Sequence, residues 1–174
     1  MDSNAFVIQG KLLVVTQPST TVAGATMTNV VVRVVDSNDA VIDSAVDAVT
    51  ATMKTDGHAG ATASAFTGGT ATAATGGAAT FNGIAISRNG PGFVLTFTAT
   101  NMAADVDSSA FVIQGKLLVF TQPSVTVAGA TMTNVVVKVV DTNDAVIDSA
   151  VDVISATIGV DPHSGGATTT LPDL

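Results

Sequence analysis

The sequence predicts an all-β fold, a sandwich of two sheets, and three observations lead to it. Short apolar runs with alternating apolar and polar positions recur along the chain, and clusters of Gly, Asn, Asp and Pro separate them. All 14 acidic residues are Asp, a usage typical of turns and strand ends rather than helix surfaces. Hydrophobic residues make up 47% of the chain but aromatic residues only 4%, so the core must consist largely of β-branched and other aliphatic side chains, which favour strands.

The first strand is expected at residues 11–16, because Pro18 cannot donate to a strand ladder. Residues 20–23 resume this strand on the other sheet. The second strand covers residues 29–36 and ends at Asp-Ser-Asn-Asp, whose short side chains bond to their own backbone and favour turns. Residues 46–54 form the third strand.

Residues 66–75 and 78–87 are expected to pair as a hairpin, because the two glycines after Thr75 accept positive φ. Residues 91–100 and 108–114 complete the seven strands. An amphipathic helix is the alternative for residues 36–49, where three aspartates are spaced four residues apart. The valine-rich flanks and the lack of Glu, Lys and Leu in this window favour strand and turn instead.

The chain also repeats itself with an offset of 105 residues, and residues 6–53 match residues 111–158 at 40 of 48 positions. A repeat of this length has the size of a domain. We therefore expect a complete sandwich at residues 11–115, the first copy, and an incomplete one at residues 116–174, the second copy, which contains the first three strands. Residues 1–10 are a spare last strand that matches residues 107–115. The copies meet directly at Gly115-Lys116, so the array should be semi-rigid.

Five segments carry a family resemblance: LLVVTQPSTTVAG, NVVVRVVDSNDAVI, GGAATFNGIAI, GPGFVLTFTA and SSAFVIQG. Together they resemble the tandem bacterial immunoglobulin-like (Big-type) repeats of large secreted adhesins and surface proteins. The resemblance covers the first copy and what is present of the second. It implies seven-stranded immunoglobulin-like sandwiches in tandem, a stalk, adhesin or surface-layer role, and no catalytic residues. The Cys pair and core Trp of antibody domains are lacking, which argues against an antigen-receptor role.

Composition excludes several classes of function. A net charge of −8 would repel a phosphate backbone, so nucleic-acid binding is not expected. The absence of cysteine removes disulfides and thiolate metal sites. No apolar run reaches the roughly 20 residues that span a bilayer. The first residues lack the basic start and apolar stretch of a signal peptide, so the chain is an internal piece of a secreted precursor or is not secreted. We expect the former, an extracellular or cell-surface location.

Two sets of charged residues are candidate sites. Oxygen ligands that calcium prefers gather at one end of the expected sandwich, and the candidate calcium ligands are Asp36, Asn38, Asp39, Asp105 and Asp107. The alternative is an Asx-type turn with a salt bridge to Lys11. Between the copies, we expect Arg88 to pair with Asp141 or Asp144 at the facing end of the second copy.

The spare first strand and the incomplete second copy predict strand complementation. One chain's donor strand would add to the open sheet of a neighbour and link chains head to tail. The donor residues are Asn4, Ala5, Phe6, Val7, Ile8 and Gln9. The alternative is that the chain is an excerpt of a longer array.

No arrangement of residues predicts an enzyme. His58 and His163 occupy equivalent turns, and one imidazole per copy supplies too few ligands for zinc and no catalytic triad. We therefore expect a structural protein that binds copies of itself and needs no cofactor; calcium bound at the candidate site is the alternative. The alternative is an adhesin module that binds carbohydrate or a receptor with the help of calcium, although the chain has no Trp or Tyr for sugar stacking.

Overall fold

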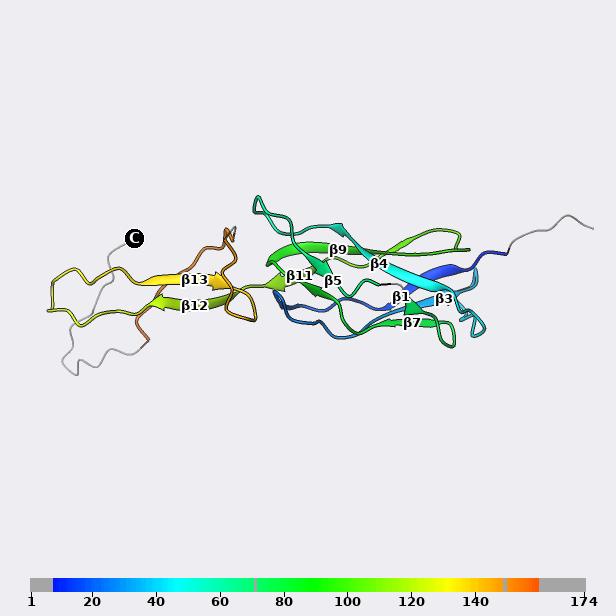
Figure 1. Ribbon diagram of the computed structural model, residues 1–174, viewed down its shortest axis with the longest axis horizontal. Coiled ribbons are helices and arrows are strands. Elements are labelled where there is room, and N and C mark those ends of the chain that lie inside the picture. The colour runs from blue at the N-terminus through cyan, green and yellow to red at the C-terminus, as the bar shows by residue number, and fades with distance from the viewer. Residues whose placement is uncertain (1–7, 71, 149, 160–174) are drawn as a thin grey trace, which may run out of the picture.

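The computed structural model of the protein describes residues 8–70, 72–148 and 150–159, and within them it is all-β, with no helix. The helix considered for residues 36–49 does not form. Most strands belong to the first copy, and the last two belong to the second (Figure 1). The strands are β1 (Lys11–Thr16), β2 (Thr21–Val22), β3 (Val30–Val35), β4 (Ala48–Thr55), β5 (Phe66–Thr67), β6 (Thr72–Ala73), β7 (Ala78–Phe81), β8 (Ala85–Ile86), β9 (Gly90–Ala99), β10 (Val106–Asp107), β11 (Phe111–Gln114), β12 (Lys116–Thr121) and β13 (Val136–Val140).

Two sheets of the first copy face each other across one core, an arrangement consistent with a β-sandwich. One sheet has the order β1-β3-β7, and the other has the order β2-β11-β9-β4-β6 with β10 paired to β9. Burial alternates along β7, β9 and β11, as a half-buried strand requires. The fully buried side chains come from both sheets and include Val30, Val32, Val49, Phe93, Leu95, Phe97 and Ile113.

The long hairpin predicted for residues 66–87 is wrong, although its turn is in the right place. Gly76 and Gly77 have positive φ, and Thr75 and Ala78 bridge across them. The flanking strands are short, however, and they join different sheets: β6 pairs with β4, β7 with β3, and β5 with β8. The sequence pattern does not reveal this crossing between sheets, because small Ala, Gly and Thr side chains specify neither register nor face strongly.

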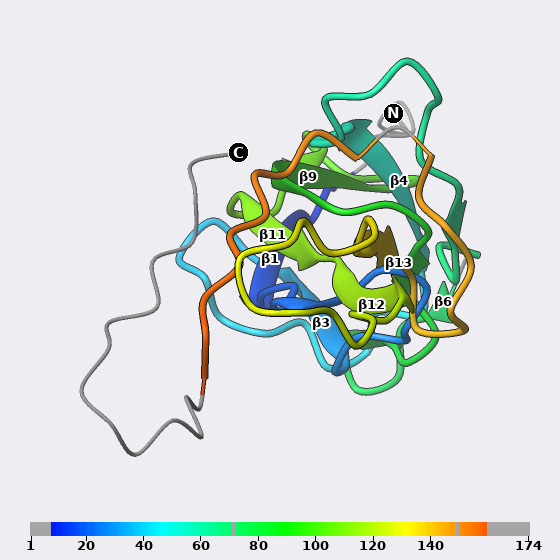
Figure 2. The same ribbon diagram turned by 90° about the vertical axis from the view of Figure 1, so that its left-hand side faces the viewer.

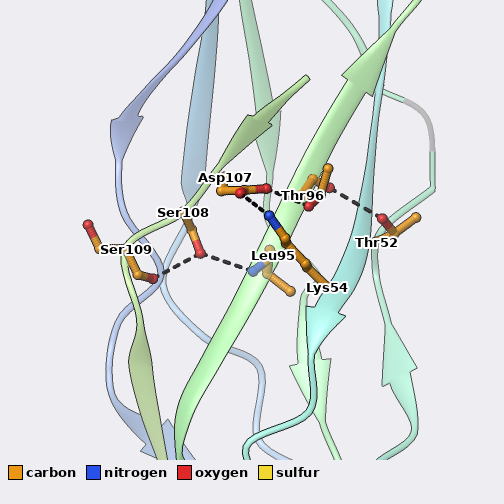
Figure 3. A network of polar contacts seen from close by, with 7 residues as sticks. All are labelled: Thr52, Lys54, Leu95, Thr96, Asp107, Ser108 and Ser109. Carbon is orange, nitrogen blue, oxygen red and sulfur yellow. Dashed lines mark hydrogen bonds and ion pairs between the residues drawn. The ribbon is translucent and has the colours of Figure 1, made fainter. Parts of the chain in front are cut away.

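The last strand of the first copy is also divided. Residues 108–114 were expected as one strand, and they form β11 after a break at Ser108 and Ser109. The Ser108 hydroxyl accepts the Leu95 N–H at 3.0 Å and donates to the Ser109 carbonyl at 2.9 Å (Figure 3). β11 then pairs antiparallel with β9 and parallel with β2. This position between β2 and β9 buries Phe111 and Ile113 in the core.

The second copy begins with the same local structure as the first. β12 pairs with β13 as β1 pairs with β3, with the counterpart residues opposite each other and the bulge at the counterpart position. Residues 151–158, the counterpart of the third strand, carry no strand. In the first copy that strand, β4, pairs with β9, and the counterpart of β9 would fall beyond Leu174.

Candidate functional site

The junction between the copies combines polar and apolar contacts and is the candidate functional site. β11 runs through Gly115 into β12, so the two copies lie in line along the long axis (Figure 1). Viewed along that axis, the β12–β13 pair and its loops lie in front of the first copy (Figure 2). The junction therefore joins the copies end to end.

At the junction, two hydrogen bonds join described residues of the two copies. The Thr142 N–H donates to the Ala23 carbonyl at 2.9 Å, and the Asn89 Nδ2 donates to Asp152 Oδ2 at 2.7 Å. Asn89 is only 6% exposed, so its bond to the carboxylate is shielded from water on the asparagine side. These contacts fix both the approach and the rotation of one copy on the other.

Gly24 lets the two copies approach closely. Its φ is +78°, and a Cβ there would lie 3.3 Å from an Asp141 carboxylate oxygen. A side chain at this position would therefore be strained by its backbone and crowded by the second copy. We call Ala23, Gly24 and Asn89 the trailing end of the first copy.

Apolar contact accompanies the polar contact. Ile147 of the second copy is 5% exposed and belongs to the hydrophobic core of the first copy, and Val139 and Ala150 pack against that core. We call the docked residues Asp141, Thr142, Ile147 and Asp152 the leading end of the second copy. The core thus continues from one copy into the next.

The sequence predicts an ion pair at this junction, between Arg88 and either Asp141 or Asp144. Asp144 forms its salt bridge with Lys116 of its own copy at 2.6 Å. The Asp141 carboxylate accepts the Asn143 and Ala145 N–H groups and so shapes its own turn. Arg88 is half-buried beside Asn89, and its pairing with Asp141 or Asp144 stays a prediction.

Sequence reasoning missed Asn89 and Asp152, although each carried a weak signal. Asn89 directly follows Arg88, and Asp152 is the second-copy counterpart of Asp47. Ala23 contributes only a main-chain carbonyl, which no side-chain pattern could reveal.

Of the candidate calcium ligands, Asp36 and Asp39 have other partners. Asp36 Oδ1 accepts the Asn38 and Ala40 N–H groups, and Asp39 pairs with Lys11 at 2.7 Å. The exposed Asp105 precedes β10. Among the described residues, no group of three or more His, Asp or Glu side chains is placed to hold a metal ion. The arrangement is that of the alternative considered above, an Asx-type turn with a salt bridge.

Asp107 lies farther along the sheet, in an exposed polar network (Figure 3). Its carboxylate forms an ion pair with Lys54 and accepts the Thr96 hydroxyl at 2.6 Å. The hydrogen bond from Lys54 and then that from Thr96 hold the pKa of Asp107 below its ordinary value. Asp107 therefore joins three neighbouring strands, β4, β9 and β10.

Another polar cluster orders the loop after β4. Asp56 accepts hydrogen bonds from the His58 N–H, the Ser64 N–H and the Ser64 hydroxyl. Burial favours the neutral acid, but the Ser64 and His58 hydrogen bonds outweigh it and hold the pKa of Asp56 below its ordinary value. His58 Nδ1 in turn lies 2.7 Å from the Asn89 carbonyl oxygen. The loop thus supports the trailing end.

The predicted strand donor lies mainly outside the described residues, which exclude Asn4, Ala5, Phe6 and Val7. Ile8 is 83% exposed, and the Gln9 Nε2 donates to the Met102 carbonyl at 3.3 Å. The same four letters, FVIQ, recur in β11. There, Ile113 is 1% exposed.

The second copy leaves the inner face of its strands uncovered. Leu117 is 57% exposed and Val135 is 42% exposed, whereas their counterparts Leu12 and Val30 are 3% and 0% exposed. The difference arises because the second copy has no opposing sheet among the described residues. Large apolar side chains exposed on this copy are Leu117, Val119, Phe120, Val125, Val127, Met132, Val135, Val136, Val146, Val151, Val153, Ile154 and Ile158.

Comparison of the chain with protein-family models, curated proteins and solved structures found no match. In the part of the chain that the structure describes, no helix has the length and apolar character needed to cross a membrane.

Proposed function

We propose that the chain is a non-enzymatic structural protein of the cell exterior, in which immunoglobulin-like modules are joined end to end to build a stalk, fibre or filament. The observation that carries the proposal is the junction. Strand β11 passes into β12 through one glycine, and two hydrogen bonds and a shared apolar core hold the copies in line. A flexible linker would instead leave each module to move independently.

The recurrence of local structure supports an array of like modules. The Asx-type turn and the salt bridge from the first strand both recur: Lys11–Asp39 at 2.7 Å corresponds to Lys116–Asp144 at 2.6 Å. The hydroxyl contact Ser19–Thr28 likewise corresponds to Ser124–Thr133. Each copy therefore presents the same leading surface, as an array requires.

We further propose that chains link head to tail by strand complementation, with residues 4–9 as the donor. β11 supports this because it holds the same FVIQ sequence between β2 and β9, with Phe111 on Phe93 at 5.9 Å between ring centroids. The acceptor would be the uncovered second copy of a neighbouring chain. Its exposed apolar strands are the kind of surface that added strands cover.

Negative-stain electron microscopy of the purified chain tests the array role, with rod-like particles expected whose two parts lie in line. Globular particles with randomly oriented lobes would contradict it.

Complementation is tested by light scattering over a concentration series. We expect filaments or large oligomers, which Ile8→Lys should abolish, because the counterpart Ile113 is buried. Gln9→Lys adds the same charge at a position whose counterpart, Gln114, is exposed, and should leave assembly intact. Compact monomers at all concentrations would end the complementation proposal.

A further inference from the structure

The leading end of the first copy matches the surface that docks in the junction at three of its four residues. The counterparts of Asp141, Ile147 and Asp152 are Asp36, Ile42 and Asp47, and that of Thr142 is Ser37. Asp36 organises its turn as Asp141 does, with hydrogen bonds of 2.8 and 2.9 Å to Oδ1 in both. The backbone that would donate at Ser37 is therefore already shaped like that at Thr142.

Docking at the junction increases the burial of apolar side chains at the leading end. Ile147 is 5% exposed even though the described residues of its own copy form no second sheet, whereas Ile42 is only half-buried in a copy whose core is complete. The same contrast holds for the strand that leads into each copy, since Ile113 is 1% exposed and Ile8 is 83% exposed. The contact with the preceding copy accounts for the extra burial of Ile147.

A cavity at each of the two leading ends supports the same reading. A cavity of about 450 Å³ at the leading end of the first copy is lined by Ile8, Gly10 and Asp47, among others. A cavity of about 420 Å³ at the junction is lined by the counterparts Ile113, Gly115 and Asp152, and its other wall includes Asn89 of the preceding copy. Asp47 occupies the place from which Asp152 accepts the Asn89 amide.

We propose that the leading end of the first copy, formed by Asp36, Ser37, Ile42 and Asp47, is a docking surface for the trailing end of another copy of this repeat. The partner would supply an Ala23-type carbonyl to the Ser37 N–H and an Asn89-type amide to Asp47, while Ile42 packs on its core. The contact is heterologous, so it propagates in one direction and does not close into a two-fold dimer. The inference rests on the array role proposed above. It names the surface that would fix the orientation of successive modules in the array.

Amide exchange followed by NMR tests the inference first in the chain as it is. The Thr142 and Ser37 amides lie in matching turns, and only Thr142 faces a preceding copy in this structure. At a dilution where light scattering shows single chains, we expect Thr142 to exchange at least about tenfold more slowly than Ser37, because its hydrogen bond must open before exchange. Equal rates would overturn the inference.

The second test uses an extended chain in which residues 11–115 occur twice in tandem before residues 116–174. Ser37 of the inner copy now faces a trailing end, and its exchange should slow to that of Thr142. Asp47→Ala in the inner copy should reverse much of this protection. Asp43→Ala removes an exposed aspartate nearby and should not, and circular dichroism verifies that both variants fold.

The outcomes separate this inference from the array role. If Ser37 stays unprotected while small-angle scattering shows an elongated chain, docking at Ser37 is wrong and the array role stands. If the extended chain collapses into a compact particle, both proposals fail.

Discussion

At the scale of single residues, a few aspartates organise loops by accepting several hydrogen bonds each. Asp36 and Asp141 cap matching turns, and Asp107 joins strands in an exposed network. Asp56 has the largest such role, because three donors from His58 and Ser64 converge on its carboxylate. These residues serve local order, which fits a chain that uses Asp as its sole acidic residue.

Replacing Asp56 by Ala should lower the free energy of unfolding by about 1–3 kcal/mol at pH 7, because buried donors of the loop lose their acceptor. Urea denaturation measures this loss. Asp43→Ala, at an exposed site, is the control and should change stability little.

The effect of Asp56 should also depend on pH in a defined direction. Its folded-state pKa is lowered, so its stabilisation is present above the ordinary aspartate pKa of about 4 and is lost as pH falls through the folded value. The wild-type chain and Asp56→Ala should therefore converge in stability as the pH falls through the lowered folded-state pKa of Asp56. A difference that persists unchanged into acid would contradict this account.

At the scale of elements, two copies of one sequence contribute differently to the free energy of unfolding, because one is buried and the other exposed. Ile8 and Ile113 lie in the same FVIQ segment, yet one is 83% and the other 1% exposed. Ile113→Ala should cost about 2–5 kcal/mol, since it leaves a cavity in the core. Ile8→Ala should change the unfolding free energy by less than about 0.5 kcal/mol in dilute solution. Denaturant unfolding of both variants checks the pair, and similar losses would show that β11 is not the core strand described.

The short strands β5 and β8 depend on a glycine contact. Gly68 has a φ of +79°, and a Cβ there would collide with the Gly83 backbone. Gly92 has a φ of +80° with open space around it. Gly68→Ala should thus destabilise the chain by more than Gly92→Ala, whose cost is about 1–2 kcal/mol from backbone strain alone. Thermal unfolding compares them, and equal costs would show that Gly68 and Gly83 do not pack closely.

At the scale of the whole molecule, the strongly patterned parts of the fold could be predicted and the small-residue parts could not. The predicted first strand, residues 11–16, is β1 as observed, because Pro18 marks its end and valines and leucines mark its body. The division of residues 66–87 was missed because Ala, Thr and Gly there carry no period. The site was predicted from charge at Arg88 and Asp141, whereas the observed contacts use a main-chain carbonyl and an amide side chain, which no charge pattern reveals.

The uncovered face of the second copy should make the whole chain self-associate. Many of its apolar side chains are exposed together, and contiguous apolar patches of this kind drive association. Leu117→Lys should raise the concentration at which oligomers appear in light scattering by about tenfold, because a charge at 57% exposed Leu117 opposes burial of the face. The substitution also makes the net charge less negative than −8, so weaker association could not come from greater repulsion between chains.

Leu13→Lys is the control. It makes the same change on the outer side of β1, where Leu13 is 36% exposed, and should leave the association unchanged. If both variants associate as the wild type does, the face stays uncovered in solution and the contact between chains lies elsewhere.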